Sequence, residues 1–208
     1  MGRMLVKVCG MREGCNIRDV ETLGPDWMGF IFYPKSPRYV KEVPSYLPAN
    51  AKRVGVFVDA DLEFITRTAE RFALDLVQLH GKEYPDMIRA LRCALPEGIK
   101  IIKAFNIAER EDLRQIRDYT EVADYFLFDT KALLAGGNGS KFNWDLLGLY
   151  QGDTPFLLSG GIGPEDADAI RSFSHPMLYG VDLNSRFESS PAVKDIALLK
   201  HFFNQLQQ

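Results

Sequence analysis

The chain has 208 residues, of which 46% are hydrophobic and 25% are charged, and its formal net charge is −3. This composition argues against a disordered chain, and the slight negative charge argues against a protein that binds nucleic acid over its whole surface. No apolar run approaches the roughly 20 residues of a membrane span, and the N-terminus lacks the apolar core of a signal peptide. We therefore expect a cytoplasmic globular protein that binds neither nucleic acid nor membranes.

Short apolar segments recur along the whole chain. Their length and their Val, Ile and Phe content are typical of strands that are buried on both faces of a parallel sheet. In chain order the expected strands are Leu5–Cys9, Trp27–Tyr33, Arg53–Val58, Leu76–Leu79, Ile99–Phe105, Tyr125–Asp129, Pro155–Ser159 and Leu178–Leu183.

Helical patterns lie between several of these strands. Residues Leu62, Ile65, Ala69 and Phe72 share one helical face, whereas Leu113 and Ile116 mark a weaker helix. The segments after the second and sixth strands are the least helical. Two further helices are expected to begin at Gly163-Pro164-Glu165-Asp166 and at Ser190-Pro191, the second with Val193, Ile196 and Ala197 as its apolar stripe.

About eight strand–helix units are the number that closes a (β/α)₈ TIM barrel. We expect a single compact barrel domain over residues 1–208, near the lower end of the usual size range and with short loops on at least one face. The structural alternative is an open, doubly wound sheet with a ligand crevice.

Polar and glycine residues gather where the expected strands end. In a barrel these carboxyl ends meet at one face, where the active site lies. The residues there include Cys9, Arg38, Asp59, His80, Lys103, Asp129, Ser159, Gly160, Gly161, Asp182, Asn184 and Ser185.

The sequence Ser159-Gly160-Gly161 closes the seventh strand, and a helix start follows it. Glycines allow an anion to approach the backbone, and Asn184-Ser185 after the eighth strand would face the same place. We favour a phosphate site over a glycine turn needed only for packing. A second glycine-rich segment, Gly136–Lys141, is either a lid or a plain flexible connection.

Candidate catalytic and ligand-binding residues each have a plain alternative. Cys9 is a base, a nucleophile or an inert core thiol, and Asp129 is a proton donor or a carboxylate tied to a neighbour. Arg38 grips a carboxylate with two hydrogen bonds or lies in a surface loop. His80 orients a ligand or caps its own strand.

Neither the cysteines nor the histidines have the spacing of a metal site. Cys9, Cys15 and Cys93 form no CxxC pair, so we expect free thiols in a reducing compartment, with Cys15 and Cys93 purely structural. The histidines are far apart in the sequence, so no metal is expected.

The order of these motifs resembles the phosphoribosylanthranilate isomerase family, from about residue 5 into the last helix. The start Lys7-Val8-Cys9-Gly10 and the turn Pro34-Lys35-Ser36-Pro37-Arg38 are the segments most specific to that family. The others are Val54-Gly55-Val56-Phe57-Val58, Gln78-Leu79-His80-Gly81, Phe128-Asp129-Thr130, Ser159-Gly160-Gly161-Ile162 and Gly180-Val181-Asp182.

The resemblance implies a (β/α)₈ enzyme that carries out an Amadori rearrangement in tryptophan biosynthesis, without a cofactor. By position, Cys9 matches the family's general base and Asp129 its general acid, and Arg38 matches the residue that binds the anthranilate carboxylate. The implied partner is a small phosphorylated substrate, and we expect a monomer or a homodimer. The other substrate-binding positions are His80, Gly160, Gly161, Asp182, Asn184 and Ser185.

Two loops depart from the family pattern. Asn184-Ser185-Arg186 stands where Ser-Ser-Gly is usual, so Arg186 either adds a phosphate contact or crowds the site. Residues 136–144 place Ser140 at the usual lysine and move the charge to Lys141. The alternatives to the isomerase are another phosphate-binding barrel enzyme and a barrel that binds a phosphorylated ligand without catalysis.

Overall fold

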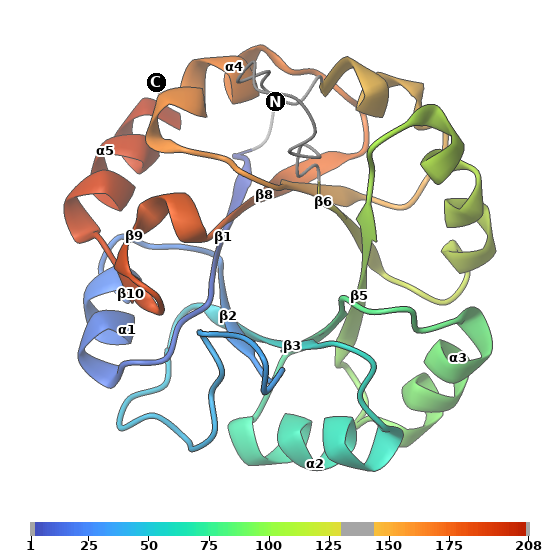
Figure 1. Ribbon diagram of the computed structural model, residues 1–208, viewed down its shortest axis with the longest axis horizontal. Coiled ribbons are helices and arrows are strands. Elements are labelled where there is room, and N and C mark those ends of the chain that lie inside the picture. Colours follow the sequence, from blue (N-terminus) through green and yellow to red (C-terminus); the bar gives the residue numbers. More distant parts are fainter. Residues whose placement is uncertain (1–2, 130–143, 207–208) are drawn as a thin grey trace.

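Eight parallel strands close into a barrel that is surrounded by helices and loops (Figure 1). The computed structural model describes residues 3–129 and 144–206. Each strand pairs with the next along the chain, and the last pairs with the first, which confirms the barrel and excludes the open sheet. The strands are β1 (Leu5–Cys9), β2 (Trp27–Ile31), β3 (Lys52–Phe57), β4 (Leu76–Leu79), β5 (Lys100–Asn106), β6 (Tyr125–Asp129), β7 (Phe156–Ser159) and β8 (Leu178–Leu183).

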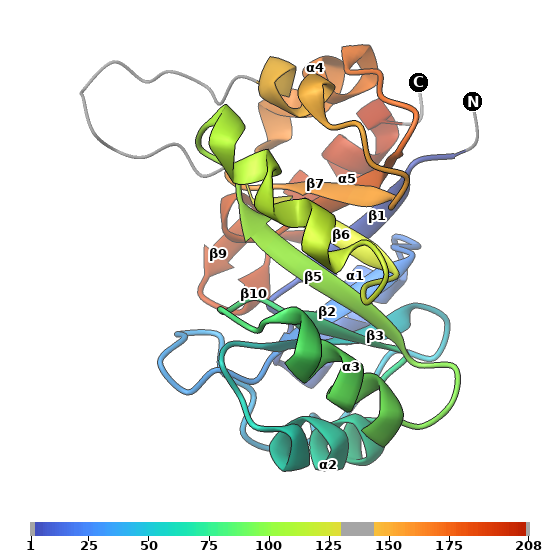
Figure 2. The same cartoon turned by 90° about the vertical axis from the view of Figure 1, so that its right-hand side faces the viewer.

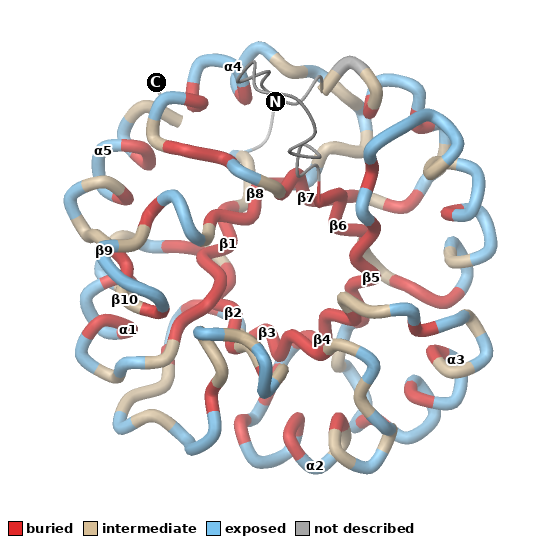
Figure 3. The backbone as a smooth tube through the Cα atoms, viewed as in Figure 1, coloured by how far each residue is buried: buried red, intermediate tan, exposed pale blue. Residues whose placement is uncertain are grey.

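The helices lie outside the ring of buried strands in Figure 3, and Figure 2 shows the same helices and strands from the side. None of the helices in the described ranges has the length and apolar character needed to cross a bilayer. The α-helices are α1 (Gly14–Glu21), α2 (Leu62–Phe72), α3 (Pro85–Ala94), α4 (Ala167–Ser172) and α5 (Ile196–Leu206). The short 3-10 helices are η1 (Arg110–Leu113), η2 (Gln115–Tyr119), η3 (Trp144–Leu149), η4 (Pro164–Asp166) and η5 (Ser185–Phe187).

Local signals explain where these helices form. Asp61 caps α2 by accepting a hydrogen bond from the Phe64 amide at 2.7 Å, and Ile65 and Ala69 face the core as expected. The weak helical pattern after β5 folds into η1 and η2 instead of an α-helix. Residues 32–51 after β2 contain no helix, and the described part of the segment after β6 contains only η3, which confirms the expectation for both.

The interior of the barrel is apolar at one end and polar at the other. Successive side chains of a strand point to opposite faces, so alternate positions share the interior. Trp27, Val54, Leu76, Leu127 and Leu157 belong to the apolar interior layer. Nearer the carboxyl ends the buried side chains are polar, and they include Lys7, Gln78, Asp129, Ser159 and Asp182. The strand register therefore places polar groups together at the end where strands β1 to β8 finish.

The helix expected to begin at Ser190-Pro191 does not form there, so that prediction is wrong. Instead β9 (Glu188–Ser190) and β10 (Val193–Lys194) make a small antiparallel hairpin, with Ala192 at a φ of 68° in its turn. Helix α5 begins after Asp195, whose carboxylate accepts hydrogen bonds from the amides of Ala197 and Leu198. Asp195 thus supplies the cap that the Ser-Pro pattern had suggested five residues earlier.

Candidate active site

The carboxyl ends of the strands enclose a cavity of about 280 Å³. All of the residues that the sequence predicted for the site line this cavity, although they come from the strand ends and loops of six different strands. They are Cys9, Arg38, His80, Asp129, Gly160, Gly161, Asp182, Asn184 and Ser185. The structure therefore brings the candidate residues together, while their individual roles stay predictions.

Cys9 is the last residue of β1 and is only 3% exposed. Its neighbour on β2 is Gly29, where a Cβ atom would lie 2.7 Å from the Cys9 sulfur, so only glycine leaves room for the thiol. Burial raises the pKa of the Cys9 thiol above its usual value, although the cations Lys7 and Lys194 act in the opposite direction. A thiolate at this position must therefore form against the cost of burial.

A row of polar side chains crosses the floor of the cavity from β8 to β6. Lys7 Nζ donates hydrogen bonds to Asp182 Oδ1 at 2.9 Å and to Gln78 Oε1 at 2.8 Å. Gln78 Nε2 lies 3.0 Å from His80 Nδ1, and His80 Nε2 lies 3.6 Å from Asp129 Oδ2. This row connects the lysine beside Cys9 with the proposed acid on the other side of the cavity.

Hydrogen-bond chemistry fixes the direction of this row. An ammonium group only donates, so the amide oxygen of Gln78 must face Lys7 and its nitrogen must face His80. The Gln78 amide therefore donates to His80 Nδ1, which places the imidazole proton on Nε2. That N–H is directed toward Asp129. The structure thus places a polar N–H beside the Asp129 carboxyl group.

Arg38 lies in the turn after β2, and a carboxylate of the protein already occupies part of its guanidinium group. Its Nε donates to Glu188 Oε1 at 2.8 Å and its Nη2 to Glu188 Oε2 at 2.6 Å. Glu188 Oε1 also accepts a hydrogen bond from Lys194 Nζ at 2.6 Å. Burial alone would raise the pKa of Glu188, but the hydrogen bonds from Arg38 and Lys194 hold it below its usual value. Among the described residues, the hydrogen bonds of the Arg38 guanidinium use Nε and Nη2 and leave Nη1 without a partner.

The glycine pair after β7 has the backbone geometry that only glycine adopts easily. Gly160 and Gly161 have φ angles of 97° and 69°. A Cβ atom at Gly161 would meet nothing within 4 Å, so the backbone conformation, rather than lack of space, requires glycine there. The helix start at Gly163 is confirmed as the 3-10 helix η4 followed by α4, and the Gly163 amide donates to Asp166 Oδ2 at 2.8 Å.

The two departures from the family pattern have different outcomes. Arg186 Nη2 makes an ion pair with Glu165 Oε1 at 2.6 Å, with both side chains about half exposed, and the cavity lining in the described ranges does not include Arg186. Arg186 therefore links the loop after β8 to η4 instead of crowding the site. The segment Gly136–Lys141, and with it the lid interpretation, lies outside the described residues.

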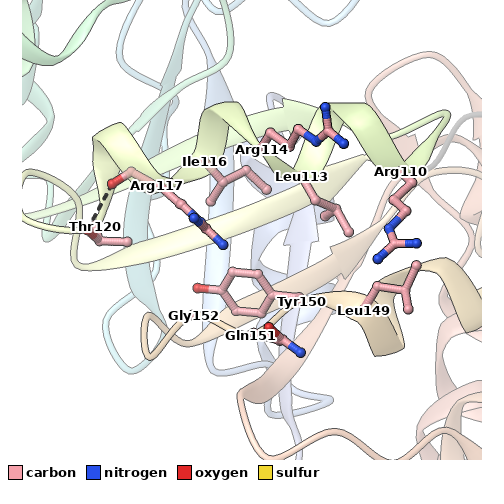
Figure 4. Close-up of a pocket in the computed structure, with 10 residues that line it drawn as sticks. All are labelled: Arg110, Leu113, Arg114, Ile116, Arg117, Thr120, Leu149, Tyr150, Gln151 and Gly152. Atoms are coloured by element: carbon pink, nitrogen blue, oxygen red, sulfur yellow. Dashed lines mark hydrogen bonds between the residues drawn. The ribbon is translucent and has the colours of Figure 1, made fainter.

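A second cavity, of about 460 Å³, lies on the outer side of the barrel between residues 110–120 and 149–152 (Figure 4). In Figure 4 the side chains of Arg110 and Arg117 are directed toward residues 149–152, whereas Arg114 points away. As far as the described residues show, its lining has no cysteine, histidine or carboxylate. It therefore lacks the paired thiol and carboxyl groups that the cavity at the strand ends provides.

Four functional neighbours of the site were missed by reasoning from the sequence: Lys7, Gln78, Glu188 and Lys194. The first two carried a signal, because each is a polar residue inside an expected buried strand, two positions before Cys9 or His80 and therefore on the same face. Glu188 and Lys194 carried none, because Glu188 precedes the helix start expected at Ser190-Pro191 and Lys194 lies within that expected helix. Within residues 3–129 and 144–206, no group of three or more His, Cys, Asp or Glu side chains is arranged to hold a metal ion.

Comparison with known proteins identifies the family. Residues 6–205 match the family model described as N-(5'phosphoribosyl)anthranilate (PRA) isomerase. A curated protein of Phocaeicola vulgatus named N-(5'-phosphoribosyl)anthranilate isomerase is 50% identical over 205 residues, which cover 99% of this chain and 98% of that protein.

Solved structures lead to the same family. Phosphoribosyl anthranilate isomerase from Thermotoga maritima matches with a TM-score of 0.83 and 34% identity over 98% of both chains. Another solved structure, of a phosphoribosyl anthranilate isomerase in complex with reduced 1-(o-carboxyphenylamino)-1-deoxyribulose 5-phosphate, matches with a TM-score of 0.82 and 31% identity over 98% of both chains. Because the family model covers nearly the whole chain and the barrel carries the expected residues in one cavity, this chain belongs to the N-(5'-phosphoribosyl)anthranilate isomerase family.

Proposed function

We propose that this chain catalyses the Amadori rearrangement of N-(5-phosphoribosyl)anthranilate to 1-(2-carboxyphenylamino)-1-deoxyribulose 5-phosphate in tryptophan biosynthesis, with Cys9 as general base and Asp129 as general acid. The observation that carries this proposal is that a thiol from β1 and a carboxyl group from β6 face one cavity, three strands apart around the barrel. The same cavity holds the Arg38 guanidinium and the glycine turn that suit the two anionic ends of this substrate.

The reaction divides into two proton transfers. Asp129 gives its proton to the ribose ring oxygen while the bond from that oxygen to the anomeric carbon breaks, which leaves a protonated Schiff base. The Cys9 thiolate then removes the proton from the adjacent carbon, and the electron pair of that C–H bond moves into the Schiff base to form an enolamine. Tautomerisation gives the ketone. The Schiff base accepts the electrons, so the reaction needs neither a metal nor an organic cofactor.

The two catalytic groups must begin this cycle with Asp129 protonated and Cys9 ionised. That is the reverse of their order in water, where a carboxyl group loses its proton more readily than a thiol. Lys7 and Lys194 favour the thiolate, and the N–H of His80 stabilises the Asp129 carboxylate that proton donation leaves behind. Polar groups fixed in place before the reaction act in this way without reorganising.

Each end of the substrate has a matching part of the cavity. We assign the phosphate to the backbone of Gly160, Gly161 and the Asn184-Ser185 segment, because positive-φ glycines let an anion approach the main chain. The anthranilate carboxylate goes to the Nη1 end of Arg38. The sugar lies between His80 and Asp182, whose two carboxylate oxygens are already held by Lys7 and Ser159.

The substitution Arg38→Met is expected to raise KM about 10- to 100-fold with a smaller effect on kcat, because it removes a charge-assisted hydrogen bond to the substrate carboxylate but no proton-transfer group. Steady-state kinetics check this, with Arg12→Met as the matched control, since Arg12 is an exposed arginine paired with Glu13. An unchanged KM in Arg38→Met would place the carboxylate elsewhere.

The substitution Arg186→Gly, which restores the residue usual in the family, is expected to change kcat and KM by less than about twofold. An exposed ion pair such as Arg186–Glu165 contributes little. The same kinetic assay checks this. A large rise in KM, matched by weaker inhibition by inorganic phosphate, would show that Arg186 contacts the phosphate after all.

The activity itself is tested by mixing the purified protein with freshly prepared phosphoribosylanthranilate and following the loss of anthranilate-type fluorescence. We expect a rapid decrease that scales with protein concentration. No change with folded protein in excess would favour a different phosphorylated substrate for this cavity.

We also propose that residues 1–208 form one domain, which acts in the cytoplasm as a monomer or a homodimer. The main support is a continuous apolar cluster that runs from β1 through every strand to α5. A single cooperative unfolding transition and a mass from light scattering test these two statements.

A further inference from the structure

Three charged side chains form a compact cluster beside the cavity: Arg38, Glu188 and Lys194. Glu188 lies in the middle and accepts hydrogen bonds from both cations. The side chain of Glu188 is 5% exposed and that of Lys194 is not exposed at all. Two positive charges and one negative charge leave a net charge of +1 on this cluster, which we call the Glu188 cluster.

A buried excess of positive charge is costly unless it serves an anion. The pair Arg38–Glu188 alone would be neutral and would give a substrate carboxylate little net attraction. Lys194 adds a second positive charge against the single negative charge of Glu188. Glu188 therefore cannot balance both cations, and the cluster keeps a net positive charge beside the cavity. The Lys7–Asp182 pair is balanced, so it does not supply this charge.

The Glu188 cluster also lies directly against the residue that follows Cys9. Gly10 has a φ of 80°, and a Cβ atom there would lie 2.7 Å from Arg38 Cδ, 2.7 Å from Asn184 Oδ1 and 3.4 Å from Lys194 Nζ. A side chain at Gly10 would therefore displace the cluster. The absence of that side chain lets the ammonium group approach β1 at the point where the thiol is held.

The position of Lys194 is set by the fold. The side-chain amide of Asn16, on α1, accepts a hydrogen bond from the Lys194 amide at 2.8 Å and donates one to its carbonyl oxygen at 2.9 Å. The Lys194 ammonium group then donates to Asn184 Oδ1 at 2.9 Å as well as to Glu188. Helix α1 thus anchors the hairpin, and the hairpin carries the ammonium group into the site.

We propose that Lys194 is a positioning residue that gives the Glu188 cluster its net positive charge: through Glu188 it holds the Arg38 guanidinium for the substrate carboxylate, and its own charge favours the Cys9 thiolate. The first effect rests on the proposed function, whereas the second does not depend on the identity of the substrate. The charged and titratable groups that face Cys9 are Lys7 on β1, Asp182 on β8, Glu188 on β9, Lys194 on β10 and Arg38 after β2, with His80 and Asp129 across the cavity.

The test compares Lys194→Met, which keeps the length of the side chain but removes its charge, with Lys194→Arg, which keeps the charge. Both are made in a chain whose exposed cysteines are replaced, Cys15→Ser and Cys93→Ser, so that iodoacetamide reports on Cys9 alone. We expect Lys194→Met to shift the pH profile of Cys9 alkylation upward by about one unit or more and to raise KM at least about tenfold. Lys194→Arg should restore much of both.

A double substitution separates charge from structure. In Glu188→Gln with Lys194→Met the only remaining charge of the cluster is that of Arg38, so the net charge returns to +1. If Lys194 acts through charge, KM of the double variant lies closer to that of the parent than KM of Lys194→Met does. The proposal would be overturned if the KM increase of the double variant equalled the product of the increases in the two single variants, with all variants keeping the parental thermal unfolding midpoint.

The two proposals fail in different ways. If the parent protein shows no isomerase activity but Lys194→Met still shifts the alkylation profile, the proposed function fails and the effect of Lys194 on Cys9 stands. If the parent is active while Lys194→Met keeps the parental alkylation profile and KM, the inference about Lys194 is wrong.

Discussion

Replacing Cys9 by alanine is expected to lower kcat by a factor of about 10² to 10⁴, the usual contribution of a positioned general base. The thiol lies in the cavity at the end of β1, and the neighbouring Gly29 leaves space that is filled by its sulfur. Alanine removes the proton acceptor but keeps the strand, because its side chain fits wherever the cysteine Cβ does. Initial rates from the fluorescence assay and the thermal unfolding midpoint together measure this effect.

The chain supplies two matched controls for this substitution. Cys15 and Cys93 are exposed on α1 and α3, away from the cavity lining. Replacing either by alanine should leave kcat and KM unchanged. Full activity in Cys9→Ala would mean that another group removes the proton, and equal losses in all three variants would point to a general effect of cysteine removal.

Much of the barrel follows from local sequence patterns. The strand Leu76–Leu79 was predicted with its observed bounds, because a short apolar run between turn residues has few other uses in a packed core. Cys9, Asp129 and Asp182 were found for a related reason. Cys9 and Asp129 end such runs and Asp182 is the second-last residue of one, and the parallel pairing of the strands then carries all three to the same face.

Long-range contacts decided the features that local patterns missed. Ser190-Pro191 has the local signature of a helix start, yet it lies in a hairpin because Asn16 pairs with the Lys194 backbone and Arg38 binds Glu188. These partners are 178 and 150 residues away in the sequence, so no short window includes them. The hydrogen bonds from Arg38 to Glu188 could not be predicted from the sequence for the same reason.

The direction of the Lys7–Gln78–His80 row also needed three-dimensional information. The sequence shows that Gln78 and His80 alternate on one strand, but not that a lysine from β1 meets the Gln78 oxygen. Only that contact forces the amide nitrogen toward His80 and the imidazole N–H toward Asp129. A donor-only group thus sets the proton arrangement at the far side of the cavity.

Asp124, at the opposite end of β6 from Asp129, provides a control for substitution of the proposed acid. Asp124, just before β6, accepts hydrogen bonds from Arg92, Lys100 and the Ile101 amide, which lower its pKa. Asp124→Asn should therefore cost about 1 kcal/mol of stability near neutral pH and leave kcat unchanged. The stabilisation from the Asp124 carboxylate is fully present above the ordinary pKa of an aspartate. It is lost as the pH falls through the lowered pKa that Asp124 has in the folded protein.

Asp129→Asn is expected to lower kcat about 10²- to 10⁴-fold with an unchanged unfolding midpoint, because asparagine has the same shape but no proton to give.

Asp129→Asn should also change the pH dependence of kcat/KM. In the parent enzyme the active form needs a protonated Asp129 and an ionised Cys9. Between the pKa values of these two groups, the fraction of ionised Cys9 rises with pH as fast as the fraction of protonated Asp129 falls, so kcat/KM is flat. Without the acid only the thiolate requirement remains. The residual kcat/KM of Asp129→Asn should therefore rise with pH, by about tenfold per unit, until Cys9 is ionised, and burial places that point above the usual pKa of a thiol. A flat profile in this variant would show that Asp129 is not the partner of Cys9 in proton transfer.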